Sequence, residues 1–415
     1  MTVPFPSRLV ILTDFASPRG GASSLAIAQA EAMAMRGLKV TVIAGDQHQS
    51  APPGVDLVSL SGQRLLDAGA LNAASRGIWD RNVSRQIAAW IAKFDDDQTI
   101  YHLHGLQQTL SPSALSPLAT VAHRLVIHAH DYFLACPNGA YFDYQANSSC
   151  TREAMSAACV TRHCDKSSRA HKLWRVVRQA VQNRRIKAVS RDATLVLLRP
   201  EMAARLPEFG RTIALANPAR AFGALSQKSA KSTFFYIGDL NRYKGIFILA
   251  EAARRADVPL IFIGDGQERA ALRQKWPEHR ITGWLDRPKI AAELSQALAV
   301  VAPSLGPEPF GLAPVEALLS QIPVILGAKM LIANEVAAAG AGIKIIPGSV
   351  ESLTDALLLL KKEDALQQSM SMAATACGKS LSMTMDQWID RLLSIYGNIL
   401  SAQQDDSDIY AVAAQ

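Results

Sequence analysis

Two glutamates lie eight positions apart in the stretch PEPFGLAPVEALLSQIPVIL, residues 307–326. Glu308 lies in a loop rich in proline, whereas Glu316 lies in an apolar segment that favours a helix beginning at Gly311. The first N–H groups of such a helix are free to bind an anion or a hydroxyl. Because a helix rises 1.5 Å per residue, Glu316 would lie about 7.5 Å beyond the helix start and could bind a different part of one long ligand, such as a diol. The alternative, a surface glutamate on an exposed helix face, fits poorly with its apolar neighbours.

Short apolar runs that alternate with alanine-rich helical stretches are the elements that must position these carboxylates. The runs cover residues 8–15, 39–46, 99–105, 124–131 and 188–198, and then 232–239, 259–266, 299–304, 322–328 and 342–348. Continuous Val and Ile runs separated by helices predict parallel sheets covered on both faces. At 415 residues the chain is long enough for two such domains. We predict an α/β fold with two doubly wound, Rossmann-like domains facing across a cleft, at 1–215 and 216–380, and a flexible tail at 401–415.

Ligands bind beyond the carboxyl ends of the strands in sheets of this kind, so the loops after the predicted strands take priority. Gly20 and Gly21 follow the first strand and would let the backbone approach a substrate, although a tight turn requires glycine equally well. His130 ends a later strand, and we predict that it reaches the cleft. A histidine buried for structural reasons is the alternative. Asp95–Asp97 precede a strand, at the opposite edge of the sheet, so we interpret them as a solvated loop rather than a metal site.

The net charge of +7 is concentrated in one segment, residues 166–187, which holds eight Lys or Arg and no acid. Leu173, Val176, Val177 and Val181 give it an apolar stripe with a basic opposite face, the pattern of a helix that rests on anionic lipid. A solvated helix face is the alternative. No aromatic platform or recognised binding module accompanies the basic patch, so we do not expect nucleic acid as a partner.

The default location that we predict is the cytoplasm, with peripheral contact at the inner face of the membrane. No apolar run in the sequence reaches the roughly 18 residues that a membrane-spanning helix needs. The stretch MTVPFPSRLVILTDF suits a first buried strand better than a signal peptide.

Several motifs together resemble the retaining glycosyltransferases of family 4, which have the GT-B fold. Glu308, seven intervening residues and Glu316, within PSLGPEPFGLAPVEALLSQIPVIL, look like the signature of that family. ASPRGGASS resembles its amino-terminal glycine loop with Gly20 and Gly21, AHDY its strand-end histidine, YIGDLNRYKG its phosphate-binding loop, and IGDGQERAAL the following strand and turn. QWIDRLLSIYGNIL resembles the final helix, which would run over 384–400 and complete the first domain.

The resemblance implies roles in binding a nucleotide diphosphate sugar, the donor. Glu316 would bind the ribose hydroxyls, and Glu308 would lie near the transferred sugar. The backbone N–H groups of Phe310, Gly311 and Leu312 would hold sugar and phosphate oxygens.

The resemblance also implies roles in the chemical step. Lys244 matches a lysine whose charge would stabilise the departing diphosphate. His130 matches a histidine that faces the reacting sugar. The arginine that family members have directly after the glycine of the phosphate loop is missing, since Asp239 stands there and Arg242 lies three residues later. Either Arg242 reaches the diphosphate from its shifted position or the site is weaker than usual.

Cys136, Cys150, Cys159 and Cys164 lie within 29 residues, although the chain has only five cysteines. Similar cysteine-bearing insertions follow the same histidine motif in a bacterial subset of the family. In a reducing compartment four thiols favour zinc or an iron–sulfur centre over disulfides. Because their spacings differ from a standard CxxC pair, merely packed thiols are the alternative. A metal bound here would have a structural role.

The sequence therefore predicts a retaining glycosyltransferase that moves a hexose to a glycan or lipid-linked glycan acceptor, of the cell-surface polysaccharide or lipopolysaccharide type. The resemblance implies that catalysis requires no metal or other cofactor, since Lys244 and helix dipoles can supply the electrostatic stabilisation. Two alternatives remain: a GT-B epimerase acting on the nucleotide sugar, and a degenerate sugar-binding scaffold, which only Asp239 suggests.

Overall fold

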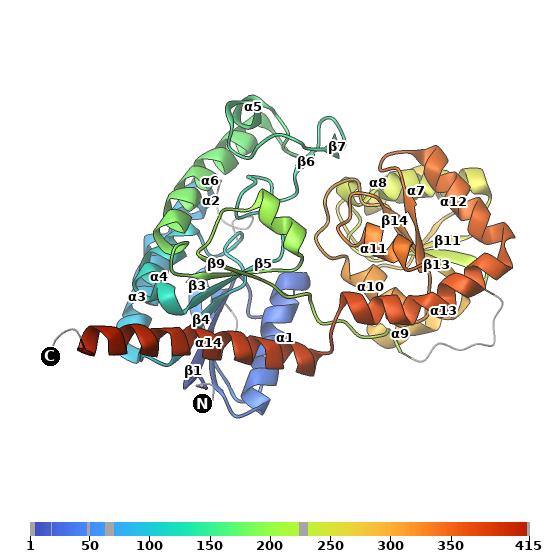
Figure 1. Ribbon diagram of the computed structural model, residues 1–415. Coiled ribbons are helices and arrows are strands. Elements are labelled where there is room, and N and C mark those ends of the chain that lie inside the picture. The colour runs from blue at the N-terminus through green and yellow to red at the C-terminus, as the bar shows by residue number, and fades with distance from the viewer. Residues whose placement is uncertain (1–4, 18, 48–49, 63–69, 224–230, 413–415) are drawn as a thin grey trace.

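The computed structural model describes residues 5–17, 19–47, 50–62, 70–223 and 231–412 and consists of two α/β domains (Figure 1). The first domain contains a seven-stranded sheet in the order β3-β2-β1-β4-β5-β8-β9, with every neighbouring pair parallel. Its strands are β1 (Arg8–Thr13), β2 (Lys39–Asp46), β3 (Val55–Gly62), β4 (Thr99–Leu103), β5 (Leu125–Ala129), β8 (Thr194–Leu197) and β9 (Arg211–Ala214). The sequence did not predict β3 or β9, which form the two edges of the sheet.

Helices cover both faces of this sheet. They are α1 (Gly21–Met35), α2 (Ala70–Ile78), α3 (Arg81–Phe94), α4 (Leu115–Leu118), α5 (Ala157–Thr161) and α6 (Arg169–Val189), with 3₁₀ turns at Pro112–Ala114, Ala119–Arg124 and Pro200–Arg205. Successive side chains of a strand point to opposite faces. Accordingly, Leu9 and Ile11 of β1 belong to the core under α1, whereas Val10 and Leu12 belong to the core under α3.

The second domain contains a six-stranded parallel sheet in the order β12-β11-β10-β13-β14-β15. Its strands are β10 (Thr233–Ile237), β11 (Leu260–Ile263), β12 (Arg280–Ile281), β13 (Ala297–Ala302), β14 (Val324–Gly327) and β15 (Gly342–Ile345). Its helices are α7 (Ile246–Ala256), α8 (Arg269–Lys275), α9 (Arg287–Glu293), α10 (Leu312–Leu319), α11 (Ala333–Ala338), α12 (Val350–Lys362) and α13 (Asp364–Leu381), with 3₁₀ turns η4 (Arg242–Lys244) and η5 (Leu294–Gln296). The predicted pair of doubly wound parallel-sheet domains is confirmed.

Helix α14 (Met385–Val412) leaves the second domain and crosses back along the first (Figure 1). Trp388, Leu392 and Tyr396 of this helix are fully buried in the core that contains Leu9. Each such side chain contributes about 1.5–3 kcal/mol by burial, so the crossing helix is part of the first domain's core. The helix is longer than the predicted 384–400: the part of the predicted tail up to Val412 is helical, and residues 413–415 lie outside the described part of the chain.

The segment between β5 and α6, residues 130–168, forms an insertion at the top of the first domain (Figure 1). It contains α5 and the antiparallel pair β6 (Phe142–Asp143) and β7 (Ser148–Ser149). The ring of Phe142 lies 5.3 Å from the ring of Tyr243 in η4, centroid to centroid, in an edge-to-face contact. The insertion therefore contacts the second domain directly.

The basic segment forms helix α6, but the predicted division into an apolar stripe and a basic face does not match which of its side chains are buried. Leu173 and Val177 are 63% and 44% exposed, whereas Lys172 and Arg178 are buried. The buried polar face holds two loops at the carboxyl ends of strands. Arg178 Nη2 donates to the Leu106 carbonyl at 2.5 Å, and the amides of two glutamines of the same helix donate to the carbonyls of residues 133 and 134. A polar face is buried here because its partners are backbone carbonyls rather than apolar side chains.

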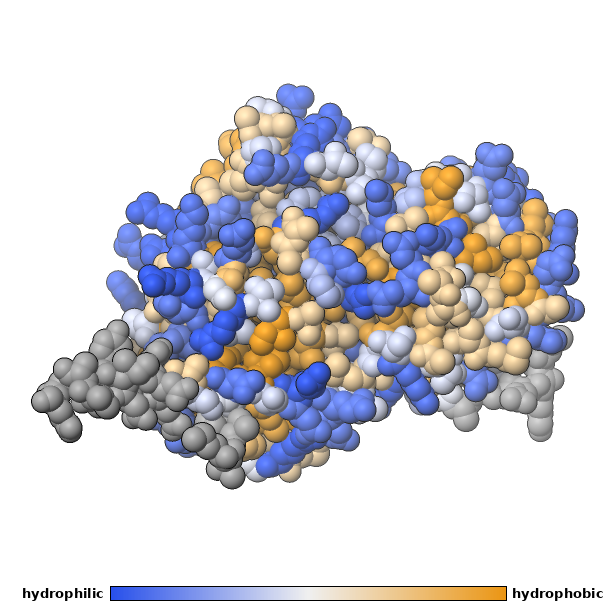
Figure 2. All heavy atoms as spheres, viewed as in Figure 1, coloured by the Kyte–Doolittle hydropathy of each residue, from blue (hydrophilic) through white to orange (hydrophobic). Residues whose placement is uncertain are grey.

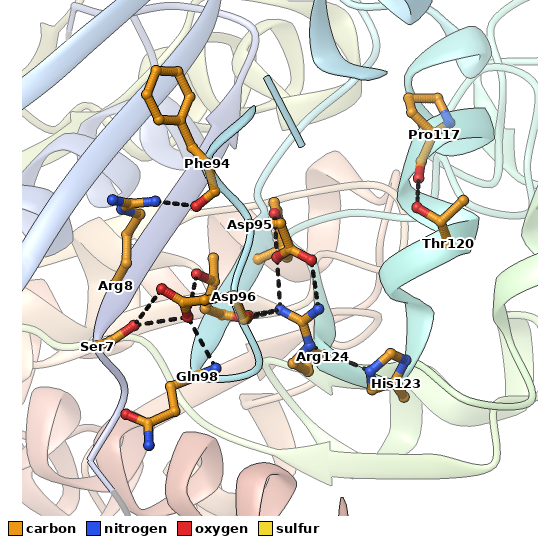
Figure 3. Close-up of polar contacts among 12 residues, drawn as sticks. Ser7, Arg8, Phe94, Asp95, Asp96, Gln98, Pro117, Thr120, His123 and Arg124 are labelled. Carbon is orange, nitrogen blue, oxygen red and sulfur yellow. Dashed lines mark hydrogen bonds and ion pairs between the residues drawn. The ribbon is translucent and has the colours of Figure 1, made fainter. Parts of the chain in front are cut away.

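Asp95 and Asp96 anchor the amino-terminal edge of the first sheet (Figure 3). The guanidinium of Arg124 binds both carboxylate oxygens of Asp95, at 2.7 and 2.8 Å, and the carbonyl of Asp96. The carboxylate of Asp96 accepts hydrogen bonds from Ser7 Oγ at 2.9 Å and Thr99 Oγ1 at 2.9 Å. Asp96 and Asp97 are exposed, as the predicted solvated loop requires, and the loop is in addition a structural anchor. The sequence analysis did not identify Arg124 as the partner of Asp95.

Figure 2, in the view of Figure 1, shows hydrophilic residues over much of the surface, with apolar residues gathered near the middle of the view and also on the second domain. Among the described residues, no helix combines the length and the apolar character that crossing a membrane requires.

Candidate functional site

A cavity of about 400 Å³ lies between the two domains, at the carboxyl ends of their strands. Seven of the predicted site residues line it: Gly20, Gly21, His130, Glu308, Phe310, Gly311 and Leu312. The first domain also contributes Asp14, Arg19, His104, Gln107 and Asp131. The structure therefore brings together residues that lie almost 300 positions apart in the chain.

Helices from opposite domains begin at this cavity. Helix α1 follows Gly20, whose φ of 96° is a conformation that side-chain-bearing residues rarely adopt. Helix α10 follows Gly311, with φ of 73°, where an added Cβ would lie 2.6 Å from Met330 Cε. Within the described part of the chain, neither helix has a side-chain cap at this end. The free N–H groups and the positive ends of the two helix dipoles make the cavity favourable for an anion.

Glu308 forms an ion pair with Lys244 on one side of the cavity. Lys244 Nζ lies 2.5 Å from Glu308 Oε1, and Ser304 Oγ donates to the other carboxylate oxygen. Burial by itself would raise the pKa of this carboxyl, but the charge and hydrogen bond of Lys244, with the Ser304 hydroxyl, hold the pKa of Glu308 below its usual range. Glu308 is therefore ionised at neutral pH, and a cation stands beside it.

Glu316 is buried in α10 and bound to Arg287, at the start of α9. Arg287 Nη1 lies 2.5 Å from Glu316 Oε1, and Nη2 donates to the carbonyls of Arg220 and Ala221 at 2.9 and 2.8 Å. Burial raises the pKa of Glu316, and the hydrogen bond of Arg287 opposes that effect. The residues that line the cavity do not include Glu316.

Arg242, the candidate replacement for the missing arginine, points elsewhere in this structure. Its Nε lies 2.9 Å from Glu268 Oε1, and its side chain is 58% exposed. Asp239, at the position of the missing arginine, accepts a hydrogen bond from Asn241. Neither Arg242 nor Lys244 is among the residues that line the cavity. Lys244 is, however, paired with Glu308, which does line it.

His130 is the outer member of a chain of hydrogen bonds that continues into the first domain's core. His130 Nε2 lies 3.0 Å from His104 Nδ1, and His104 Nε2 lies 2.7 Å from the amide oxygen of Gln29 in α1. The Gln29 amide nitrogen lies 2.7 Å from the Tyr396 hydroxyl in α14, and that hydroxyl lies 2.6 Å from His102 Nδ1. The crossing helix is thereby connected to the cavity.

The hydrogen-bond chain selects one tautomer of His130. Burial lowers the pKa of His130 to about 4, and it lowers that of His104 well below the usual value, so both rings are neutral at pH 7. Because an amide oxygen only accepts, His104 must donate from Nε2 and accept at Nδ1. His130 then donates from Nε2, which leaves Nδ1 as its acceptor nitrogen.

Among the described residues, one set of three histidine, cysteine or acidic ligand atoms lies within 4.8 Å of one another, from His102, His104 and His128. Both nitrogens of His104 are already hydrogen-bonded, whereas His128 Nδ1 and Nε2 are buried and have no hydrogen-bond partner in the part of the chain that the structure describes. Burial lowers the pKa of all three histidines well below the usual value, so the group consists of neutral imidazoles, with the rings of His102 and His128 stacked 5.4 Å apart.

Asp14 and Asp131 are acids in the cavity wall that the sequence did not single out. Asp14 accepts from the backbone N–H groups of Gln107, Thr109 and Leu110 at 2.8–2.9 Å, so its function is to hold the loop after β4. Burial raises the pKa of Asp131 to about 6. Its position directly after His130 was the one signal that could have identified it.

Residues 220–376, which carry Lys244, Glu308 and Glu316, match the family model described as glycosyl transferases group 1. This match supports a glycosyltransferase. No curated protein matches the chain.

Solved structures resemble the chain over nearly its whole length. Sucrose-phosphate synthase from Thermosynechococcus elongatus has a TM-score of 0.69 at 16% identity, over 95% of this chain and 100% of that one. HepE from Anabaena, solved with UDP and glucose, has a TM-score of 0.64 at 15% identity, over 93% and 98%. WaaG, a glycosyltransferase involved in lipopolysaccharide biosynthesis, has a TM-score of 0.64 at 16% identity, over 94% and 99%. At these identities the likeness shows the fold, and the predicted GT-B fold is confirmed.

Proposed function

We propose that the chain is a retaining glycosyltransferase of the family 4 type that transfers a hexose from a nucleotide diphosphate sugar to a glycan or lipid-linked glycan. The observation that carries the proposal is the arrangement in one cavity of Glu308 with its Lys244 partner, His130, and the starts of α1 and α10. These groups come from both domains and suit a ligand that combines a diphosphate with a sugar.

The diphosphate of the donor would lie near the start of α10, where free N–H groups bind its oxygens. Lys244 would share its charge between Glu308 and the departing diphosphate. The ribose hydroxyls would bind Glu316, whose Oε1 also accepts from Arg287. The UDP complex of the similarly folded HepE supports a nucleotide donor.

In the transfer step, the bond between the anomeric carbon and the diphosphate oxygen breaks while the acceptor oxygen bonds to the same face of the sugar. The proton of the acceptor hydroxyl passes to the departing diphosphate oxygen, so no enzyme nucleophile is consumed. Glu308 would stabilise positive charge at the anomeric centre, and His130 would orient the sugar. No step of this mechanism requires a metal.

We also propose that the protein contacts an anionic membrane from the cytoplasmic side through α6, which would bring it close to a lipid-linked acceptor. Leu173 and Val177 are exposed on this helix, and the basic side chains of Arg169, Arg184 and Lys187 are exposed as well. Basic residues near an anionic surface contribute about 1 kcal/mol each.

Incubation of the full chain with UDP-, GDP- and ADP-hexoses tests the proposal. We expect one base to raise the melting temperature and a labelled hexose to move to an added glycan acceptor with its anomeric configuration retained. Epimerised donor recovered without acceptor would identify the epimerase alternative. Binding with neither transfer, hydrolysis nor epimerisation, across glycan and lipid-linked acceptors, would identify the sugar-binding scaffold.

A further inference from the structure

Four of the chain's five cysteines lie in the insertion and at its end: Cys136, Cys150, Cys159 and Cys164. All four are free thiols, and three of them are buried, whereas Cys150 is half-buried. The insertion offers only one two-residue strand pair and a short helix as regular structure. Such a segment needs another source of rigidity.

Lys172 of α6 carries a buried ammonium next to two of these sulfurs. Its side chain is 5% exposed, and Nζ lies 3.7 Å from Cys159 Sγ and 3.3 Å from Cys164 Sγ. Both of the hydrogen bonds described for this ammonium end at sulfur. The buried carboxylate of Asp165 is bound to Arg175, at 2.7 Å. A buried cation is costly without an anionic partner, and neutral thiols do not supply one.

Two further side chains direct N–H groups at the same sulfurs. Asn138 Nδ2 lies 3.7 Å from Cys164 Sγ, while its amide oxygen lies 3.1 Å from Cys136 Sγ. Arg152 Nη1 lies 3.7 Å from Cys150 Sγ. Side-chain N–H groups thus reach the sulfurs of Cys150, Cys159 and Cys164, whereas the thiol of Cys136 donates to the Asn138 amide oxygen. Hydrogen bonds from N–H groups to sulfur are the usual second layer around thiolates that ligate a metal.

A metal ion deprotonates the thiols that bind it. Thiolates at Cys159 and Cys164 would give the buried ammonium of Lys172 the anionic neighbours that neutral thiols do not supply.

We propose that Cys136, Cys150, Cys159 and Cys164 bind a zinc ion or an iron–sulfur cluster through their thiolates, with Lys172 and Arg152 offsetting the negative charge. Each thiol loses its proton to water as its sulfur bonds to the metal. A zinc ion with four thiolates carries a net charge of −2, which Lys172 and Arg152 would offset in part, since Arg152 Nη1 also lies 3.5 Å from the carboxylate of Asp143.

The spacing of the sulfurs bears on which metal binds. Among the described residues, no three of these sulfurs lie within 4.8 Å of one another. Thiolates around a single zinc at about 2.3 Å must be closer than that, whereas an iron–sulfur cluster holds its thiolates farther apart because several iron atoms separate them. A single zinc would therefore require the sulfurs to move inward, and the metal content of the purified chain distinguishes zinc from an iron–sulfur cluster.

The metal centre would hold the insertion against the second domain, which carries the residues proposed to bind the donor. Cys136 and Cys150 flank Phe142, which contacts Tyr243 in η4, directly before Lys244. Loss of the metal should loosen that contact. The inference does not depend on the proposed transfer reaction, because metal content can be measured without any substrate.

The test is the metal content of the full chain, purified without oxygen and without a metal-affinity tag. We expect one centre per chain, recognised as zinc or as iron with acid-labile sulfide and visible absorption. The double variant Cys159→Ser/Cys164→Ser should lose at least tenfold in metal per chain. Cys377→Ser is the matched control, since Cys377 is buried in α13 away from the insertion, and it should retain the metal.

Three results would overturn the proposal. The first is a zinc or iron content below about a tenth of an equivalent per chain, which stays that low after the chain is supplied anaerobically with zinc, or with iron and sulfide. A second is a double variant that keeps its metal. The third is that His128→Phe loses the metal while the double cysteine variant keeps it, which would place the metal among the stacked histidines. If the double variant does not fold, the wild-type chain can be titrated with a mercurial instead. Release of the metal as four thiols react would support the centre. Reaction of four thiols with no metal released would contradict it.

Discussion

Arg287 Nη1 lies 2.5 Å from Oε1 of Glu316, so the carboxylate expected to bind ribose already has a positively charged partner in the second domain. We expect Glu316→Ala to weaken binding of the free nucleoside diphosphate by roughly ten- to a hundredfold, because hydrogen bonds to a charged group contribute about 1.5–3 kcal/mol. Calorimetric titration with UDP, GDP and ADP measures this. Glu351→Ala, at an exposed site in α12, is the control. Equal affinities in the two variants would remove Glu316 from the donor site.

Glu308→Gln should lower turnover on the order of a hundredfold while leaving affinity for the free diphosphate nearly unchanged. The substitution keeps the size of the side chain but removes the charge beside the sugar. Lys244, freed from its ion pair, remains available to the diphosphate. Single-turnover rates with the full donor and calorimetry with the diphosphate separate the two effects. A variant that loses diphosphate affinity at an unchanged rate would reverse the roles of the two glutamates.

His130→Ala should reduce turnover by about a hundredfold or more and change donor affinity little. Gln29→Leu removes the acceptor of His104 Nε2 and should give a smaller loss of turnover. The hydrogen-bond chain then no longer selects one tautomer of His104 and His130, but the ring of His130 is still present. Initial rates and donor titrations for both variants check this. Because burial lowers the pKa of His130 to about 4, its titration should not appear in the rate between pH 6 and 8. Unchanged turnover in His130→Ala would leave it a structural histidine.

Stability should fall as the pH drops below about 6.5, because four buried histidines bind protons in the unfolded chain before they do so in the folded one. Each contributes up to about 1.4 kcal/mol per pH unit. Asp131, whose pKa burial raises to about 6, acts in the opposite sense, but it is one group against four. Urea unfolding at several pH values gives the slope.

His128→Phe isolates one member of that set. Neither nitrogen of His128 has a hydrogen-bond partner among the described residues, so an aromatic ring of similar size should be tolerated and should reduce the slope by about 1.4 kcal/mol per pH unit. Exposed His171→Phe is the control and should leave the slope unchanged. An identical slope in both variants would contradict the assignment of acid sensitivity to the buried histidines.

The proposed membrane contact predicts flotation with vesicles that contain anionic lipid and not with neutral ones. Leu173→Asp/Val177→Asp should decrease the bound fraction several-fold, because each substitution replaces exposed apolar surface with negative charge. Met372→Asp, at an exposed site in α13, is the control. Equal flotation with both lipids, or none with either, would remove the membrane from the list of partners.

The sequence by itself identified part of the cleft lining. Apolar runs predict the strands, and Gly20, His130 and Glu308 follow such runs within a few positions. Because ligands bind beyond the carboxyl ends of parallel strands, these three residues could be placed at the cleft from the local pattern. The edge strand β3 was missed because its half-buried side chains give a weak hydrophobic pattern.

Only the tertiary structure decided which groups pair with those residues. Arg287 neutralises Glu316 from 29 positions away, Tyr396 supports Gln29 from 367 positions away, and Lys172 lies buried between two cysteine sulfurs instead of facing solvent. A helical period assigns a lysine to a polar face, but it cannot say whether that face is covered by water or by another segment. Such pairings depend on how helices dock across a sheet, and docking satisfies buried charges and hydrogen bonds between segments that the local sequence does not connect.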